Sequence, residues 1–177
     1  MKKKTLALVL ALTLLVAGVV GGTLAWLTDQ TAEVKNTFTV GDINIDLTET
    51  TTDYKMVPGN TIAKDPTVTV KANSEACWLF VKVTESTNLK DFITYAIAEG
   101  WTALPDVNGV YYREVPASAA DQTFSVLAGD AVTVKSDVTK TMLETAKTDA
   151  PTLTFKAYAI QKEHFATADA AWAEVSK

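Results

Sequence analysis

Threonine alternates with valine or isoleucine through much of this chain, and this two-residue period constrains the fold more than any other feature. Residues 67–70 spell Thr-Val-Thr-Val, and residues 37–40 and 43–47 alternate in the same way. Successive side chains of a strand point to opposite faces of a sheet, and β-branched residues pack well on its pleated surface. The pattern therefore predicts a mainly β fold whose strands bury one face.

About seven strands are expected. Turns are predicted at Pro58-Gly59-Asn60 and at residues 106–109, the second of them within a hairpin. Short strands at this spacing are typical of an antiparallel β-sandwich. The candidate strands are residues 37–47, with Gly41-Asp42 as a bulge or kink, and residues 67–71, 77–83, 110–115, 123–127, 131–134 and 152–160.

One stretch departs from the two-residue period and carries two interpretations. Residues 89–97 place apolar side chains at helical spacing, with Asn88 as an N-cap and Gly100 as a stop. The second half of this stretch also alternates, so a strand leading to Trp101 is the alternative for it.

Two further short helices are expected in the second half of the chain. Residues 139–146 have the spacing of a short helix that crosses between strands. Residues 167–175 place Ala168, Trp172 and Val175 on one side of a last helix. We expect this tryptophan to dock on the body of the protein.

The amino end has the layout of a secretory signal peptide. Three lysines follow Met1, and residues 6–20 form an apolar run that is shorter than the ~20 residues of a membrane-spanning helix. Thr23 and Ala25 supply small residues at the two positions that a signal peptidase tests, so Trp26 is the expected first mature residue. The alternative is an uncleaved anchor.

The rest of the chain is expected to form one domain, residues 26–177. This part contains no Gly/Ser-rich or Pro-rich linker and no second apolar run long enough to cross a membrane. It is acidic, since the whole chain has 16 Lys+Arg against 21 Asp+Glu and Arg113 is its only arginine. This balance argues against a nucleic-acid partner.

The counts of cysteine and histidine exclude several classes of site. Cys77 is the only cysteine and His164 the only histidine. A disulfide framework, a multi-cysteine zinc module and the two-histidine motif of helical zinc peptidases are therefore excluded. A Cys77/His164 pair has the residue types of a nucleophile and its base, but a thiol beside Trp78 in an apolar strand is expected to be buried and inert.

No other catalytic constellation is evident. The pairs Asp42/Asp46 and Asp149/Glu144 are expected on solvated faces, and the chain lacks a P-loop, a dinucleotide-binding fingerprint and a Gly-x-Ser-x-Gly elbow. We therefore expect no enzyme, no cofactor and no metal site. A protein of this kind acts through its surface, by presenting sheet edges to other copies or by binding a ligand. Residues 26–40 are either an arm that docks on a neighbour or the first strand of their own domain.

The junction after the apolar run carries a more specific pattern. Residues 21–29 spell Gly-Gly-Thr-Leu-Ala-Trp-Leu-Thr-Asp, and residues 36–43 spell Asn-Thr-Phe-Thr-Val-Gly-Asp-Ile. Both stretches resemble the TasA/camelysin family of secreted Gram-positive proteins, whose signal peptides are removed by a dedicated signal peptidase. Further stretches that resemble landmarks of the family are residues 58–60, 64–68, 78–83, 100–101, 111–113 and 157–161.

The resemblance implies a jelly-roll-like antiparallel β-sandwich with a few short helices, exported by a signal peptide of residues 1–25. Relatives build fibres of a biofilm matrix outside the cell or on its surface. In that family the mature amino-terminal strand of one subunit can complete a sheet of the next, and the matching residues here are 26–40. The implied partners are other copies of this chain, related matrix proteins and, during export, the signal peptidase and the membrane. The side chains that would carry the assembly are Trp26, Leu27, Val34, Phe38 and Val40.

Two alternatives stay open beside the fibre. Camelysin-like relatives carry a metallopeptidase label, although this chain has one histidine and no recognisable zinc motif. A monomeric surface adhesin or accessory matrix module would have the same fold and export signal but would not polymerise.

Overall fold

The structure is a computed structural model that describes residues 42–51 and 54–177. All of these belong to one compact unit, Val40–Lys177. The expected signal peptide, its cleavage residues and the arm of residues 26–40 lie outside the described residues.

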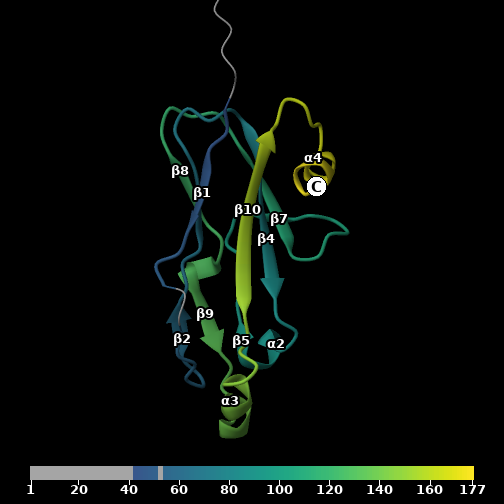
Figure 1. Cartoon of the computed structure of the whole chain (residues 1–177). Coiled ribbons are helices and arrows are strands. Elements are labelled where there is room, and N and C mark those ends of the chain that lie inside the picture. The colour runs from purple at the N-terminus through teal and green to yellow at the C-terminus, as the bar shows by residue number, and fades with distance from the viewer. Residues whose placement is uncertain (1–41, 52–53) are drawn as a thin grey trace, which may run out of the picture. The chain divides into compact units, whose positions relative to one another are not determined.

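Three strands form the first sheet (Figure 1). They are β1 (Ile45–Thr48), β3 (Thr67–Val70) and β8 (Gln122–Ser125), in the order β1-β3-β8. All pairs are antiparallel, with Ile45 opposite Val70 and Val68 opposite Phe124. The alternation of threonine and valine in β3 buries both valines and leaves the threonines half-buried, as the sequence predicts.

Four strands form the second sheet, in the order β10-β4-β7-β6. β4 is buried on both faces from Cys77 to Val81 and then alternates, because it leaves the core at this point. On its two sides β4 pairs antiparallel with β10 and β7. The strand bounds are β4 (Cys77–Glu85), β6 (Thr102–Ala103), β7 (Val110–Val115) and β10 (Leu153–Gln161).

A third, smaller sheet lies below β1 and beside the lower end of β10 in Figure 1. It consists of β2 (Thr61–Ala63), β9 (Ala131–Val134) and β5 (Ile93–Thr94), in the order β2-β9-β5. A short 3-10 turn, η1 (Ala128–Asp130), leads into β9. Helix α3 (Lys140–Ala146) follows β9 and begins at Thr139, whose hydroxyl accepts a hydrogen bond from the Met142 amide.

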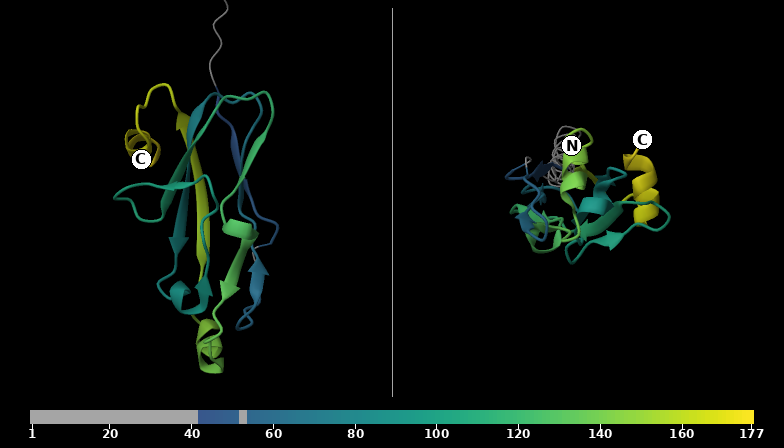
Figure 2. Two further views of the ribbon diagram at one scale, coloured as in Figure 1. Left: turned by 180° about the vertical axis from the view of Figure 1, so that it is seen from behind. Right: turned by 90° about the horizontal axis from the view of Figure 1, so that it is seen from below.

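The two larger sheets face each other in two layers, and the main core lies between them (Figure 2). The first sheet contributes Val68 and Val70, and the second contributes Leu79, Val81 and Val115, all of them almost completely buried. Each such side chain contributes about 1.5–3 kcal/mol through removal of apolar surface from water. The prediction of a mainly β fold of antiparallel sheets with a few short helices is therefore confirmed.

A second core covers the outer face of the four-stranded sheet. Helix α4 (Ala168–Val175) packs Trp172 against Phe80 and Tyr158, with ring centroids 5.3 and 5.1 Å apart. The Thr167 hydroxyl caps the helix by accepting from the Ala170 amide. The expected last helix and the docking of its tryptophan are both confirmed.

The expected helix over residues 89–97 is mostly wrong. Helix α2 spans only Leu89–Phe92, and the chain then extends into β5, where Ile93 lies opposite Val134. The alternative of a strand in the second half is closer to the structure, since Ile97 also forms an antiparallel bridge with Leu127. Pairing with β9 overrides the helical spacing because it provides hydrogen bonds for the backbone N–H and C=O groups and buries the same apolar side chains.

The turns are found where the sequence places them. The Asn60 amide donates to the Val57 carbonyl across Pro58-Gly59. Residues 106–109 connect β6 to β7 as a hairpin, with Gly109 at φ +73°. β1 begins only at Ile45, although the carbonyls of Asp42 and Asn44 already accept hydrogen bonds from Glu75 and Lys71. The first half of the predicted strand 37–47 lies outside the described residues.

Candidate functional site

The two larger sheets leave one side of their shared core half-covered. β1 and β10 are edge strands, and in residues 42–51 and 54–177 each pairs with one neighbour, β3 and β4 respectively. The two edges lie next to each other across the layers (Figure 1). We call this edge-to-edge boundary the seam. Its inward side chains are Ile43, Ile45 and Leu47 on the β1 side and Leu153, Phe155, Ala157 and Ala159 on the β10 side.

Burial of the core falls toward the seam. Val68 on β3 and Leu79 on β4 are 0% exposed, whereas all seven seam side chains are only partly buried. These side chains pack against the core on one side and leave apolar surface open on the other. An apolar strip along two neighbouring strand edges is a site where another strand can add, since it offers both backbone groups and apolar surface.

On the opposite side of the two layers, side chains of both sheets contact one another. Trp101 donates its indole N–H to the Ser125 carbonyl at 2.9 Å. The Arg113 guanidinium lies between this indole and the ring of Phe124, at 5.4 and 3.8 Å from the two ring centroids. The bridge between Ile97 and Leu127 continues these contacts. The side chains of Trp101, Arg113 and Phe124 are also only partly buried, but their mutual contacts join the two layers on this side.

Three cavities follow the seam from one end to the other. The first, of about 470 Å³, lies between Ile43, Ile160 and Phe165, close to the start of the described chain. The second, of about 380 Å³, is lined by Leu47, Glu49, Lys64 and Phe155. The third, of about 440 Å³, lies between the first residues of β10 and the small sheet. It shares Lys64, Leu153 and Thr154 with the second cavity. Its apolar lining residues include Met56, Ile62, Leu89, Ile93 and Val132.

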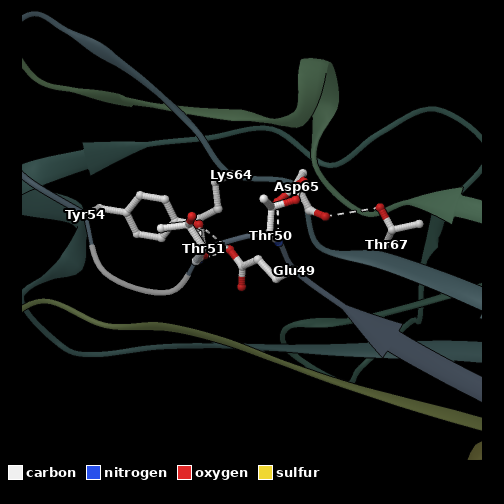
Figure 3. A network of polar contacts seen from close by, with 7 residues as sticks. All are labelled: Glu49, Thr50, Thr51, Tyr54, Lys64, Asp65 and Thr67. Atoms are coloured by element: carbon white, nitrogen blue, oxygen red, sulfur yellow. Dashed lines mark hydrogen bonds and ion pairs between the residues drawn. The ribbon is translucent and has the colours of Figure 1, made fainter.

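A polar cluster lies inside this otherwise apolar strip, where the second and third cavities meet (Figure 3). The Lys64 amine lies 2.5 Å from the Glu49 carboxylate; the Lys64 side chain is 9% exposed, and the partly buried Glu49 side chain is 17% exposed. The Tyr54 hydroxyl donates to the same Glu49 oxygen at 2.7 Å. The amine also lies over the rings of Tyr54 and Phe155, 4.7 and 5.5 Å from their centroids.

The residues around this cluster fix its position. The Asp65 carboxylate accepts hydrogen bonds from the Thr50 hydroxyl and from the Thr50 amide, the latter at 3.0 Å, and these bonds lower the pKa of Asp65. The Lys64 amide donates to the Asp130 carbonyl at 2.7 Å. Burial, and then the hydrogen bond to Glu49, raise the pKa of Tyr54 well above its ordinary value, so its hydroxyl is a donor at neutral pH.

No pattern in the sequence indicates the Lys64–Glu49 pair. The two residues are 15 positions apart and belong to no catalytic or metal-binding spacing. Only the antiparallel pairing of β1 with β3 brings the end of β1 next to the segment that precedes β3. The residues that the sequence did predict for assembly, Trp26, Leu27, Val34, Phe38 and Val40, lie outside the described residues, as do Thr23 and Ala25 of the cleavage site.

The candidate catalytic residues do not come together. Cys77 is completely buried at the start of β4, and burial raises the pKa of its thiol to about 11. His164 lies exposed in the turn after β10. Asp42, Asp46, Glu144 and Asp149 are exposed as expected. Within the described parts of the chain, no three His, Cys, Asp or Glu side chains group closely enough to hold a metal ion.

Comparisons of the chain with protein-family models, with curated proteins and with solved structures found no match. Across residues 42–51 and 54–177, no helix has the length and apolar character needed to cross a membrane.

Proposed function

We propose that this chain is a secreted structural protein that assembles into extracellular or cell-surface fibres of a biofilm matrix, as its resemblance to the TasA/camelysin family implies. In this proposal residues 1–25 are a signal peptide, and residues 26–177 form a single jelly-roll-like β-sandwich domain. The polymer forms when residues 26–40 of one copy add as a strand to the next copy.

The observation that carries the proposal is the half-covered seam between β1 and β10. A strand placed there would cover the apolar side chains Leu153, Phe155 and Ala157 and would find the edge backbone of β10 as a partner. β10 is nine residues long, so the edge offers room for a donated segment of similar length. The chain that precedes β1 is long enough to supply it.

The sequence of the proposed donor fits such a strand. Trp26, Val34, Phe38 and Val40 all fall on one face in the two-residue period, whereas Leu27 falls on the other. The other face also carries Asp29, Glu33 and Lys35. A strand with one apolar face and one charged face can cover the seam and keep its charges in water.

The direction of the chain favours exchange between copies. The described chain starts at Asp42, whose carbonyl accepts from Glu75 at the upper end of the layers in Figure 1, and β1 runs from there toward Lys64. An arm that continues straight outward from β1 leaves its own domain at this end. It then enters the lower end of the seam of a second copy and runs antiparallel to that copy's β10.

Electron microscopy of the protein beginning at Trp26 tests this function. We expect fibres from this protein and dispersed particles from a version that lacks residues 26–34. A finer pair of variants keeps the arm complete. Phe38→Asp puts a charge on the apolar face and should abolish fibres, whereas Thr39→Asp puts the same charge on the outer face and should leave them.

Other outcomes favour the alternatives. A protein that stays monomeric in size-exclusion chromatography at high concentration, with or without residues 26–34, would be an adhesin or an accessory surface module. Casein hydrolysis that a chelator stops and zinc restores would indicate a metallopeptidase, and fibres that persist without residues 26–34 would refute strand donation.

A further inference from the structure

The Lys64–Glu49 pair is the one place in the seam where a bound strand would meet charge. Lys64 and Glu49 are the only lysine and carboxylate that line the three cavities in the described part of the chain. An apolar strand laid over them would remove both from the remaining water. Buried charged groups of this kind are stable only when their hydrogen-bonding capacity is satisfied.

Within the part of the chain that the structure describes, the hydrogen bonds of the pair are incomplete. A lysine amine has three N–H donors, and in residues 42–51 and 54–177 the Lys64 amine donates only to Glu49 Oε1. The same oxygen also accepts from Tyr54, while Glu49 Oε2 has no donor within these described ranges. Among the described residues, the site therefore has donors left on the amine and an acceptor left on the carboxylate, side by side.

A primary carboxamide complements this pair, because its oxygen accepts and its NH₂ group donates. The apolar face of residues 26–40 carries two carboxamides, Gln30 and Asn36. Asn36 lies between Val34 and Phe38 on that face, in the most apolar part of the arm. We propose that Asn36 of a second copy binds the Lys64–Glu49 pair and fixes the register of the donated strand, an inference that rests on the proposed function.

This register also matches the cavities on either side of the pair. The next residue on the same face, Phe38, lies about 7 Å further along the strand. It enters the cavity of about 440 Å³ whose apolar lining includes Met56, Ile62 and Leu89, and this volume is large enough for an aromatic ring. In the other direction, Val34 lies beside Ala157, where the small side chain leaves room for it.

A one-residue slip would turn the charged face of the arm toward the core, and a two-residue slip would place Val34 or Phe38 on the ion pair. An arm folded back on its own β1 through a tight turn at Gly41-Asp42 would also bring Val34, not Asn36, to Glu49. The carboxamide thus distinguishes exchange between copies from closure within one copy. A single buried polar residue sets register in coiled coils by the same physics.

The stability of polymers formed by the protein beginning at Trp26 tests the contact between Asn36 and the Lys64–Glu49 pair. Asn36→Val should raise the concentration needed for sedimentable polymer roughly tenfold to a hundredfold, because hydrogen bonds to charged groups are lost inside an apolar strip. Gln30→Val makes the same chemical change on the same face outside the proposed contact and should change this concentration less than threefold.

A double-mutant cycle separates the contact from general effects on the arm. Lys64→Met should weaken the polymer by itself, and the Asn36→Val/Lys64→Met double variant should be no weaker than the worse single variant. Near-UV circular dichroism of monomers shows whether Lys64→Met remains folded. If it does not, Glu49→Gln takes its place in the cycle. Additive effects of the two changes would overturn the pairing.

Cysteine cross-linking measures the register directly. A chain with Val34→Cys and Ala157→Cys should form disulfide-linked ladders on a denaturing gel, while Val34→Cys with Ala159→Cys should not. Ladders from the second combination alone, or a larger effect of Gln30→Val than of Asn36→Val, would overturn the proposed register while leaving strand donation intact. Cross-linked monomers would show that the arm closes on its own copy and would refute strand donation as well. A wild-type protein that forms no polymer would refute both.

Discussion

The guanidinium of Arg113 lies 3.8 Å from the ring centroid of Phe124, across the two layers from the second sheet to the first. Its Nε atom is buried and has no hydrogen-bond partner in the described structure. The aromatic faces of Phe124 and Trp101 therefore provide its main contacts. This is the only arginine of the chain, and it joins the two layers on the side of the core that lies opposite the seam.

Replacing Arg113 should destabilise the fold, because the guanidinium no longer stacks on the rings of Phe124 and Trp101. We expect Arg113→Ala to lower the free energy of unfolding by about 1–3 kcal/mol. Arg113→Lys should recover little of this, because a lysine lacks the planar group that lies flat on Phe124. Urea denaturation followed by tryptophan fluorescence measures both. Lys82→Ala, at an exposed position of β4, is the control, and equal losses in all three variants would contradict the role of stacking.

Gly109 holds the hairpin between β6 and β7 in a conformation that other residues rarely adopt. Its φ is +73°, and a Cβ atom would lie 2.4 Å from the Val83 carbonyl oxygen. Gly109→Ala should therefore lower the free energy of unfolding by about 2–4 kcal/mol. Gly129→Ala is the matched control, since its φ is +65° but its Cβ would meet nothing within 4 Å. It should lose only about 1 kcal/mol in thermal or urea unfolding. Similar losses at the two glycines would show that the backbone at Val83 shifts to make room for the added Cβ atom.

Trp172 should hold helix α4 on the outer face of the four-stranded sheet. Trp172→Ala removes the ring that packs on Phe80 and Tyr158, and it should lower the free energy of unfolding by about 3–5 kcal/mol. Glu174→Ala, on the exposed side of the same helix, should change it by less than about 0.5 kcal/mol. Hydrogen exchange should show that α4 loses protection in the first variant while β3 keeps it. Loss of protection in β3 as well would mean that the two cores unfold together.

The thiol of Cys77 should make the protein less stable at alkaline pH. Burial raises its pKa to about 11, whereas the pKa of the unfolded thiol is ~8.5. Between these two pH values the unfolded state has lost the proton that the folded state keeps. The free energy of unfolding should therefore fall as the pH rises above about 9.

Cys77→Ala should remove the part of this fall that begins near pH 9. The part above about pH 10 should remain, because burial also raises the pKa of Tyr54 and Tyr95. Urea denaturation at a series of pH values measures both parts. In the wild-type protein, iodoacetamide at pH 8 should modify Cys77 only after denaturant is added. Rapid modification of the folded protein would contradict its burial.

Much of the β structure could be predicted from the sequence, because alternation and apolar runs report local burial. β3, β4, β7, β9 and β10 lie within one or two residues of their predicted bounds. The sequence does not predict β2 and β6. β2 has three residues and β6 has two, which are too few to establish a two-residue period. The mistaken helix ends at Phe92 because a partner strand distant in sequence, β9, pairs with the next two residues.

The candidate site could be predicted only in part. The sequence predicts that residues 26–40 add to a sheet edge of another copy, and this stays a prediction; the sequence does not indicate which edges are half-covered. That distinction depends on side chains that join the layers on one side, such as Trp101 and Arg113, and on the strand order that places β1 and β10 at the edges. The Lys64–Glu49 pair has no local signature, because its two residues meet only through the pairing of β1 with β3.

The seam and the start of β1 give any assembly built through them a polarity. The described chain begins at one end of the layers, near Glu75, while Lys64 and Glu49 lie at the other. Each junction would thus join unlike ends, and a finished filament would expose an empty seam at one tip and an unused arm at the other. The two tips would grow at different rates, and a free peptide with the sequence of the arm would stop only one of them.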